Sequence, residues 1–183
     1  MFEAILSAIR SLGPFSANDE EVFCAALQTK ALKKGDSILE KGEVCKALCF
    51  VQKGSFIQYF MDENLDKVIA NLFNQHDWAI NRASFTGQKP SMHTIEAFEE
   101  STLQVLNIHD LHALIGRSPS FFVLGKILEE IHDYQSQKLS PDQKYKLLLE
   151  KRPEVIQTFP LKYISSYLGM TPETLSRVRS RIS

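Results

Sequence analysis

The residues best suited to recognition chemistry lie near the end of the sequence, in the segment PLKYISSYLGMTPETLSRVRSRIS (160–183). In a helix starting at about Pro172, one face would carry Glu173, Ser176, Arg177 and Ser180. Arginine can donate two hydrogen bonds to guanine, a carboxylate can accept one from cytosine, and serine can do either. These residue types at this spacing predict recognition of base edges in the major groove of DNA.

The elements that must position this face are predicted by the same segment. Leu161, Ile164 and Leu168 form one face of a first helix, and Gly169 follows where a helix often ends in left-handed conformation. Thr171 is a suitable N-cap and Pro172 a suitable first helical residue. The second helix turns Leu175, Val178 and Ile182 away from its polar face. Helix, glycine turn and helix together predict a helix-turn-helix.

Basic residues flank the predicted reading face and are expected to contact phosphates. The predicted DNA-binding residues are Thr171, Glu173, Ser176, Arg177, Arg179, Arg181 and Lys162. Residues 138–183 contain nine Lys or Arg and four Asp or Glu, although the whole chain has a net charge of −1. This basic end favours a polyanionic partner.

The preceding sequence alternates between helical and extended patterns. Helices are predicted over 2–12 and from about Asp19 to Leu27. Short runs rich in β-branched and aromatic residues then predict an all-β sandwich or barrel. The predicted strands are 47–52, 55–61, 67–73, 93–98 and 103–108. The long connection between the third and fourth of these strands, with a weakly helical middle, is the place in this region where a ligand is expected.

After Ser118-Pro119 the period is helical again, and a further helix starts at Ser140-Pro141. The first of these helices carries a narrow apolar seam that favours pairing with a second copy over packing on the chain's own β domain. The seam residues are Leu124, Ile127, Leu128, Ile131 and Tyr134.

Composition sets the general class. The 183 residues are 44% hydrophobic and 23% charged, which is typical of a soluble globular protein. Three cysteines argue against a disulfide framework and favour a reducing cytoplasm. The N-terminal segment lacks the basic start of a signal peptide, and no apolar run is long enough to span a membrane.

The order of these parts resembles the Crp/Fnr superfamily of bacterial transcription regulators. The resemblance rests on KKGDSILEKGE (33–43), CFVQKGSF (49–56) and, most specifically, GMTPETLSR (169–177). Within the last motif Glu173, Ser176 and Arg177 match the E-x-x-S-R pattern of the Fnr-like branch. The resemblance implies recognition of TTGA-type half-sites, with Arg177 on guanine and Glu173 on cytosine.

The resemblance also implies an α+β fold with three parts. Residues 1–117 would form a sensor β-roll, a double-stranded β-helix like that of cyclic-nucleotide-binding domains, with flanking helices. Residues 118–138 would form a long dimerisation helix, and residues 139–183 a short helix-turn-helix domain for which we expect no β-wing. The implied partners are double-stranded DNA, a second copy of the chain and RNA polymerase.

The family's nucleotide-binding residues are replaced here. The Gly-Glu pair that holds the ribose falls at Ile80-Asn81, and the phosphate-binding arginine falls at Pro90 or Ser91. A cyclic phosphate would lose its charge-assisted contact, so we expect no tight binding of cAMP or cGMP and no cofactor. Binding of a different small-molecule effector is the alternative that the sequence leaves. The predicted degenerate pocket comprises Ile80, Asn81, Arg82, Ala83, Ser84, Ser91 and Met92.

Two other hypotheses compete with DNA binding. A cupin-like metal enzyme would need clustered histidines, but only His109 and His112 lie close together, without a third ligand. No catalytic motif accompanies them, so we expect no enzyme. The remaining alternative is a signalling or protein-interaction module with the same cyclic-nucleotide-binding-like fold that does not bind DNA.

Overall fold

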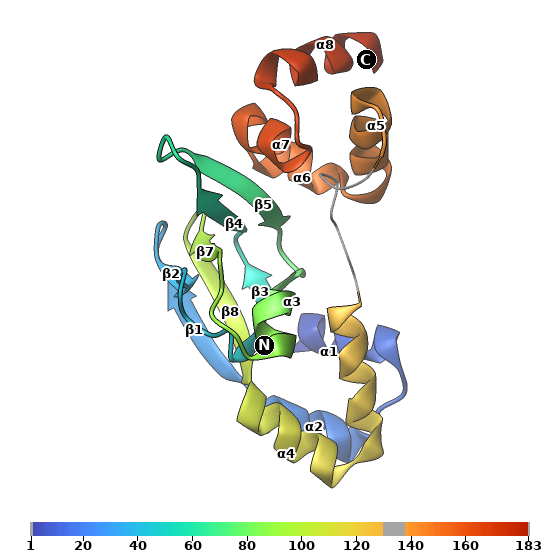
Figure 1. Ribbon diagram of the computed structural model, residues 1–183. Coiled ribbons are helices and arrows are strands. Elements are labelled where there is room, and N and C mark those ends of the chain that lie inside the picture. Colours follow the sequence, from blue (N-terminus) through green and yellow to red (C-terminus); the bar gives the residue numbers. More distant parts are fainter. Residues whose placement is uncertain (1, 130–137, 183) are drawn as a thin grey trace.

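The computed structural model describes residues 2–129 and 138–182, which form a β-roll with flanking helices and a C-terminal group of helices (Figure 1). The roll consists of two four-stranded sheets in which every described pairing is antiparallel. The first sheet, in spatial order, is β1 (Gln28–Leu32), β8 (Ser101–Asn107), β3 (Ala47–Lys53) and β6 (Trp78–Ala79). The second is β2 (Ser37–Leu39), β7 (Thr94–Ala97), β4 (Phe56–Met61) and β5 (Lys67–Phe73). The predicted α+β class with an N-terminal roll is confirmed.

The strands predicted from alternating apolar residues, β3, β4, β5, β7 and β8, lie where they were expected to within a few residues. Strands β4 and β5 form a hairpin, in whose turn Asp62 Oδ1 accepts the backbone N–H groups of Asn64 and Asp66. The sequence did not reveal β1. Its first four residues are exposed, so it lacks the apolar alternation that marks a half-buried strand.

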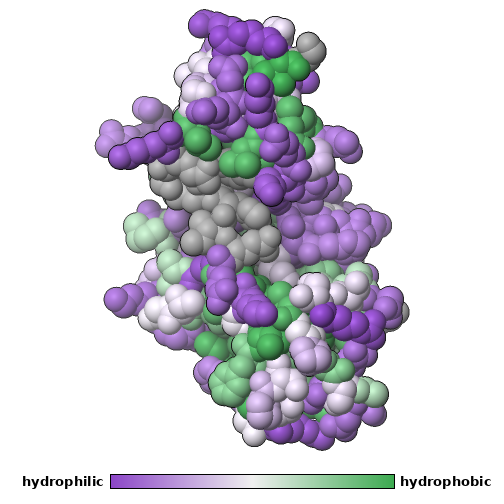
Figure 2. Space-filling view, turned by 90° about the vertical axis from the view of Figure 1, so that its right-hand side faces the viewer, coloured by the Kyte–Doolittle hydropathy of each residue, from purple (hydrophilic) through white to green (hydrophobic). Residues whose placement is uncertain are grey.

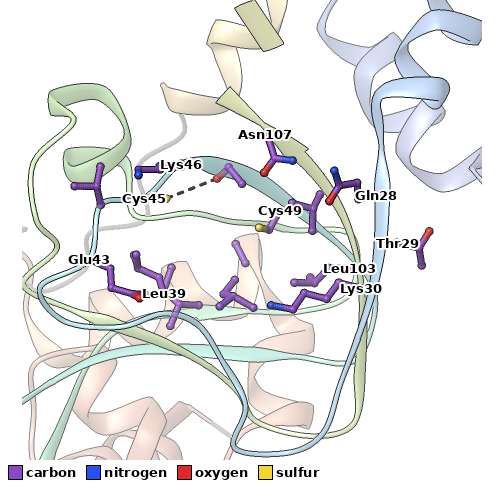
Figure 3. Close-up of a pocket in the computed structure, with 16 residues that line it drawn as sticks. Gln28, Thr29, Lys30, Leu39, Glu43, Cys45, Lys46, Cys49, Leu103 and Asn107 are labelled. Carbon is purple, nitrogen blue, oxygen red and sulfur yellow. Dashed lines mark hydrogen bonds between the residues drawn. The ribbon is translucent and has the colours of Figure 1, made fainter. Parts of the chain in front are cut away.

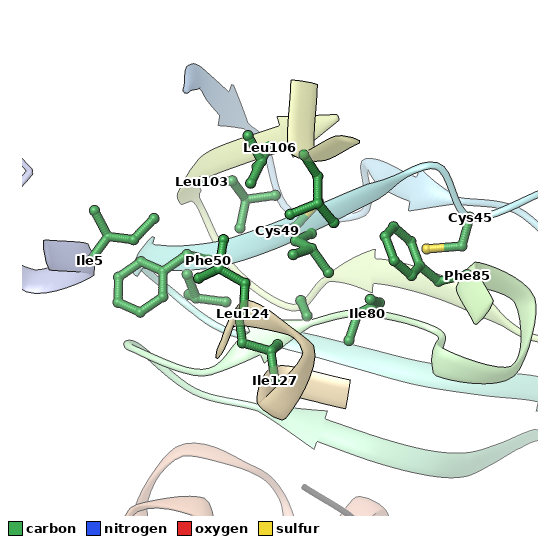
Figure 4. Close-up of a cluster of buried hydrophobic side chains, with 14 of the residues drawn as sticks. Ile5, Cys45, Cys49, Phe50, Ile80, Phe85, Leu103, Leu106, Leu124 and Ile127 are labelled. Carbon is green, nitrogen blue, oxygen red and sulfur yellow. The ribbon is translucent and has the colours of Figure 1, made fainter. Parts of the chain in front are cut away.

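Helices cover one end of the roll and complete its core. Their bounds are Glu3–Leu12 for α1, Ala17–Ala26 for α2, Ile108–Arg117 for α4 and Pro119–Leu128 for the 3₁₀ helix η1. Ser16 caps α2 in a capping box with Asp19, as its sequence favours. Figure 4 shows Ile5 of α1 beside Phe50 of β3 in the hydrophobic cluster that fills the roll.

The first half of the segment predicted to form the dimerisation helix differs from that prediction in its helix type and in its packing. It is a 3₁₀ helix, and Leu124 and Ile127 are buried in the core of the chain's own roll (Figure 4). Leu128 is partly buried against the same cluster. The seam prediction is therefore corrected at Leu124 and Ile127, because a 3-4 spacing serves a chain's own core as well as a partner. Ile131 and Tyr134 lie outside the described residues.

The C-terminal helices rest on one edge of the roll. They are α5 (Pro141–Lys151), α6 (Pro153–Thr158), α7 (Leu161–Tyr167) and α8 (Pro172–Ile182). A second hydrophobic cluster joins them to Ile57 of β4 and to Ile69 and Leu72 of β5. Because β5 is the last strand of its sheet, these helices cover an edge that would otherwise be open to another strand.

Candidate nucleic-acid interface

The turn between α7 and α8 has the geometry that the sequence predicted. Gly169 has φ +68°, and its N–H donates to the carbonyl oxygen of Ser166 at 3.0 Å. The next N–H, of Met170, donates to the carbonyl oxygen of Ser165 at 2.9 Å. The Thr171 hydroxyl accepts the N–H of Thr174 at 3.2 Å, so it caps α8 as expected. These local bonds fix the direction in which α8 leaves the turn.

Helix α8 has one buried and one exposed face. Leu175 and Val178 are fully buried in the cluster shared with the roll, and Ile182 packs partly against it. The predicted reading residues Glu173, Ser176 and Arg177 are all exposed. Figure 2 shows hydrophilic side chains over much of the top of the molecule, where Figure 1 places α8. The structure therefore brings the three residues to one accessible surface.

The charges on this face suit base recognition. The pKa of the Glu173 carboxyl is below its usual value, chiefly because it accepts its own backbone N–H and also because of Thr171 and the charge of Arg177. Glu173 is therefore a carboxylate near neutral pH and can only accept hydrogen bonds, as a contact with a cytosine amino group requires. Arg177 is an obligate donor of the opposite charge on the same face.

The flanking basic residues already have partners on the protein. Lys162 Nζ lies 3.5 Å from Asp66 Oδ1 in the β4–β5 hairpin, and both side chains are mainly exposed. Arg181 lies 3.0 Å from the carboxylate of Asp142 on α5. Arg179 is partly buried. A phosphate bound by Lys162 or Arg181 would exchange an exposed carboxylate for a DNA oxygen, a small free-energy change.

Arg152 holds this group of helices on the roll, a role that sequence analysis missed. It stands between α5 and α6, and its side chain is only 5% exposed. Its guanidinium donates to the Leu72 carbonyl oxygen at 2.9 Å, to the Tyr167 hydroxyl at 3.2 Å and to the Asp77 carboxylate. The partners come from β5, from α7 and from the loop after β5, so one side chain joins both parts of the molecule.

A backbone contact supports the same attachment. The N–H of Ile69 in β5 donates to the hydroxyl of Ser166 on α7 at 2.9 Å. A serine side chain thus takes the place of a neighbouring strand at this edge. No local sequence signal distinguishes Arg152 or Ser166 from ordinary surface residues, because their partners in the roll are about 75 to 97 positions away.

Part of the predicted effector pocket is a closed network of polar side chains around α3 (Arg82–Gly87). Asn81 caps this short helix by accepting the N–H of Ser84 at 3.0 Å, and its amide donates to the Ser91 hydroxyl at 2.9 Å. The Ser84 hydroxyl donates to the Lys89 carbonyl oxygen at 2.6 Å and accepts the backbone N–H of Cys45 at 2.9 Å. Asn81 and Ser91 thus bond to each other, and the Ser84 hydroxyl is satisfied by main-chain groups inside the protein.

The other predicted pocket residues do not join this network. Ala83 and Met92 are exposed, and Met92 retains 66% of its accessible surface. Ile80 and Arg82 line a separate cavity of about 20 Å³, which is too small for a nucleotide. The structure therefore corrects the prediction that all seven residues line one pocket.

Within residues 2–129 and 138–182, no three His, Cys, Asp or Glu side chains gather in a way that could hold a metal ion, and His109 and His112 belong to no such group. No helix in the described parts of the chain is long and apolar enough to cross a membrane.

Comparison with known proteins agrees with this architecture. Residues 29–118 match the family model of the cyclic nucleotide-binding domain. The fumarate nitrate reduction regulatory protein of Klebsiella oxytoca is 25% identical over 195 residues, which covers 92% of this chain and 75% of that protein. FixK2 from Bradyrhizobium japonicum superposes with a TM-score of 0.66 at 16% identity, covering 85% of this chain and 84% of that one. The catabolite activator protein of Thermus thermophilus superposes with a TM-score of 0.54 at 16% identity, covering 92% and 84%.

The chain therefore combines a β-roll that matches the cyclic nucleotide-binding domain with a C-terminal helix-turn-helix. The relatives named above align or superpose with this chain along most of its length. The chain resembles transcription regulators of the Crp/Fnr family in its fold and in the order of its parts.

Proposed function

We propose that this protein regulates transcription by binding double-stranded DNA as a homodimer, with one α8 helix in the major groove of each half-site of an inverted repeat. The observation that carries the proposal is the exposed face of α8, on which Glu173, Ser176 and Arg177 stand opposite buried Leu175 and Val178. A two-fold symmetric dimer places its half-sites about 34 Å apart, one helical turn of DNA.

Each residue of the interface has a proposed role. Arg177 donates to guanine, Glu173 accepts from cytosine, and Ser176 contacts a neighbouring base edge. Thr171, Lys162, Arg179 and Arg181 hold phosphates around the reading face. Arg181 must exchange Asp142 for a phosphate, and Lys162 must exchange Asp66.

The rest of the chain supplies the sensor and the pairing surface. In this proposal residues 1–117 sense a signal, residues 118–138 connect and pair the subunits, and residues 139–183 bind DNA. Leu124 and Ile127 take no part in this pairing, since both are buried in the roll. The closed network of Asn81, Ser84 and Ser91 supports a signal other than cAMP or cGMP. Contact with RNA polymerase completes the proposal.

Selection of random duplex DNA by the purified protein tests the central claim. We expect enrichment of an inverted repeat with TTGA-like half-sites, and a dimer on that site in sedimentation experiments. Affinity should fall steeply as salt rises, because phosphate contacts release counterions. If repeated selections, with and without a metabolite extract, enrich no sequence, the helix-turn-helix is not a DNA reader and the protein-interaction alternative is favoured.

Two variants separate base contacts from phosphate contacts. Arg177→Ala should cost about 1–3 kcal/mol on the selected site and relax the choice at one base pair. Lys162→Gln should weaken binding to all sequences equally and reduce the salt slope by about one. Lys41→Gln, an exposed lysine in the β-roll, is the control for loss of one positive charge. Equal losses on all sequences for Arg177→Ala would contradict its assignment to a base.

A further inference from the structure

The β-roll contains a cavity of about 680 Å³ that lies outside the polar network around α3. Strands β1, β2, β3 and β8, with single residues of β6 and β7, and the segment 43–46 form its walls (Figure 3). Its volume lies within the range of about 300–1,000 Å³ that is usual for small-molecule sites. Exposed Gln28, Lys30, Glu43 and Lys46 also line it, so it opens to solvent between β1 and this segment.

The inner wall of the cavity is apolar. Leu39, Ile95 and Leu103 are almost completely buried and contribute to it from both sheets. Cys49 also faces it, and burial raises the pKa of this thiol to about 12. The thiol is therefore uncharged at neutral pH and acts as an apolar wall group.

The mouth of the cavity carries positive charge. Lys30 pairs with Leu103 in the register of β1 and β8, which places it on the cavity side of its strand, and Figure 3 shows its side chain reaching into the cavity below Cys49. Lys46 is the second lysine of the lining. The carboxylate of Glu43 accepts the backbone N–H of Glu40 at 2.9 Å. Among the described residues, neither lysine takes part in an ion pair.

We propose that this cavity binds a small amphipathic carboxylate, with its apolar body between the two sheets and its carboxylate on the Lys30 ammonium group. An apolar wall alone would bind any apolar molecule of suitable size. A lysine at the edge of that wall favours an apolar molecule that carries one anionic group. The cavity also has a physical link to α3, because the backbone N–H of Cys45, a wall residue, donates to the Ser84 hydroxyl.

The test uses octanoate as probe and isothermal titration calorimetry of the full chain. Octanoate should bind saturably, and 1-octanol, which has the same chain without the charge, should bind more weakly. Lys30→Gln should weaken octanoate by about tenfold, the value of a charge-assisted hydrogen bond, and leave octanol unchanged. Lys33→Gln, an exposed lysine just after β1 that does not line the cavity, is the matched control.

A second variant locates the site. Ala47 lines the cavity on β3 and is half-buried, so Ala47→Leu should narrow the cavity and weaken octanoate and octanol alike. Circular dichroism spectra of all variants should match that of the parent chain.

Several outcomes overturn the proposal. Absence of saturable octanoate binding would do so, as would binding that Ala47→Leu leaves unchanged. Equal affinity for octanoate in Lys30→Gln would remove the assigned carboxylate contact. If Lys30→Gln instead causes self-association while octanoate does not bind, Lys30 serves only to protect the open edge of β1 from another strand. None of these measurements uses DNA, so the proposal can fail while the proposed reading of DNA stands.

Discussion

Replacing Arg152 by methionine tests whether the C-terminal helices depend on this residue for their attachment to the roll. Methionine keeps the length and apolar character of the side chain, so the substitution removes the charge and the hydrogen bonds with little loss of packing. Three groups lose a donor: the Leu72 carbonyl, the Tyr167 hydroxyl and the Asp77 carboxylate.

The expected cost follows from the burial of these groups. Breaking a buried ion pair from one side costs about 3–5 kcal/mol, and leaving a buried carbonyl without its donor costs about 1–3 kcal/mol. The Asp77 side chain is 31% exposed, so water solvates much of its freed charge and the cost of breaking the pair falls to about 1 kcal/mol. We therefore expect Arg152→Met to reduce the free energy of unfolding by about 2–4 kcal/mol.

Urea unfolding followed by circular dichroism measures this cost, and limited proteolysis shows whether residues 138–183 become accessible before the roll unfolds. Arg117→Met, at an exposed arginine at the end of α4, controls for the change of residue type. Asp77→Asn, alone and combined with Arg152→Met, completes a double-mutant cycle that isolates the coupling between the two side chains. A loss for Arg152→Met no larger than that for Arg117→Met would refute the reasoning.

Three further predictions concern stability and thiol reactivity. Gly54→Ala should reduce the free energy of unfolding in urea by more than about 1 kcal/mol, because φ is +89° and the new Cβ would lie 2.1 Å from Ser101 Oγ. Gly116 in α4 has open space around it, so Gly116→Ala should be neutral or stabilising in the same experiment. Ser140→Ala should lower stability by about 1 kcal/mol in thermal unfolding, because it removes the capping box of α5, and Ser140→Asp should retain most of that stability. In native protein a disulfide reagent should modify Cys24 first, because burial raises the pKa of all three thiols but only Cys45 and Cys49 are buried enough to restrict access. Rapid native modification of all three thiols would contradict this order.

The helix-turn-helix could be predicted from the sequence because its signals are local. A glycine at the end of one helix, Thr171 as a cap and the apolar period of Leu175 and Val178 each depend on neighbours within one or two turns. The strands of the roll could be predicted from the sequence in the same way wherever one of their faces is buried.

The missed features depend on distant parts of the chain. The period of Leu124 and Ile127 fixes an apolar face but does not say which surface covers it, and the core of the roll does so. Strand β1 is held by pairing with β8, about seventy-five residues away, although its own residues are mainly exposed. Arg152 shows the same limit, since a buried arginine is recognisable only when its acceptors from β5 and α7 are known.

The ion pair between Lys162 and Asp66 links the helix-turn-helix to the β-roll and also occupies a lysine that we propose binds DNA phosphate. Both side chains are mainly exposed and their charges are 3.5 Å apart, so the pair contributes at most about 1 kcal/mol. Asp66→Asn frees Lys162 for a phosphate and should raise DNA affinity by no more than about fivefold at low salt, equally for all sequences. The gain should disappear as salt rises, because exposed charges are screened.

Glu63→Gln removes the same charge from the same hairpin, and Glu63 takes part in no ion pair among the described residues, so it separates the contact from the general effect of charge. Filter binding of the selected and of unrelated duplexes would measure both variants. A gain confined to the selected sequence would assign Lys162 to a base rather than a phosphate. A gain well above fivefold would mean that Asp66 holds the helix-turn-helix away from DNA, since a single exposed ion pair is too weak to produce it.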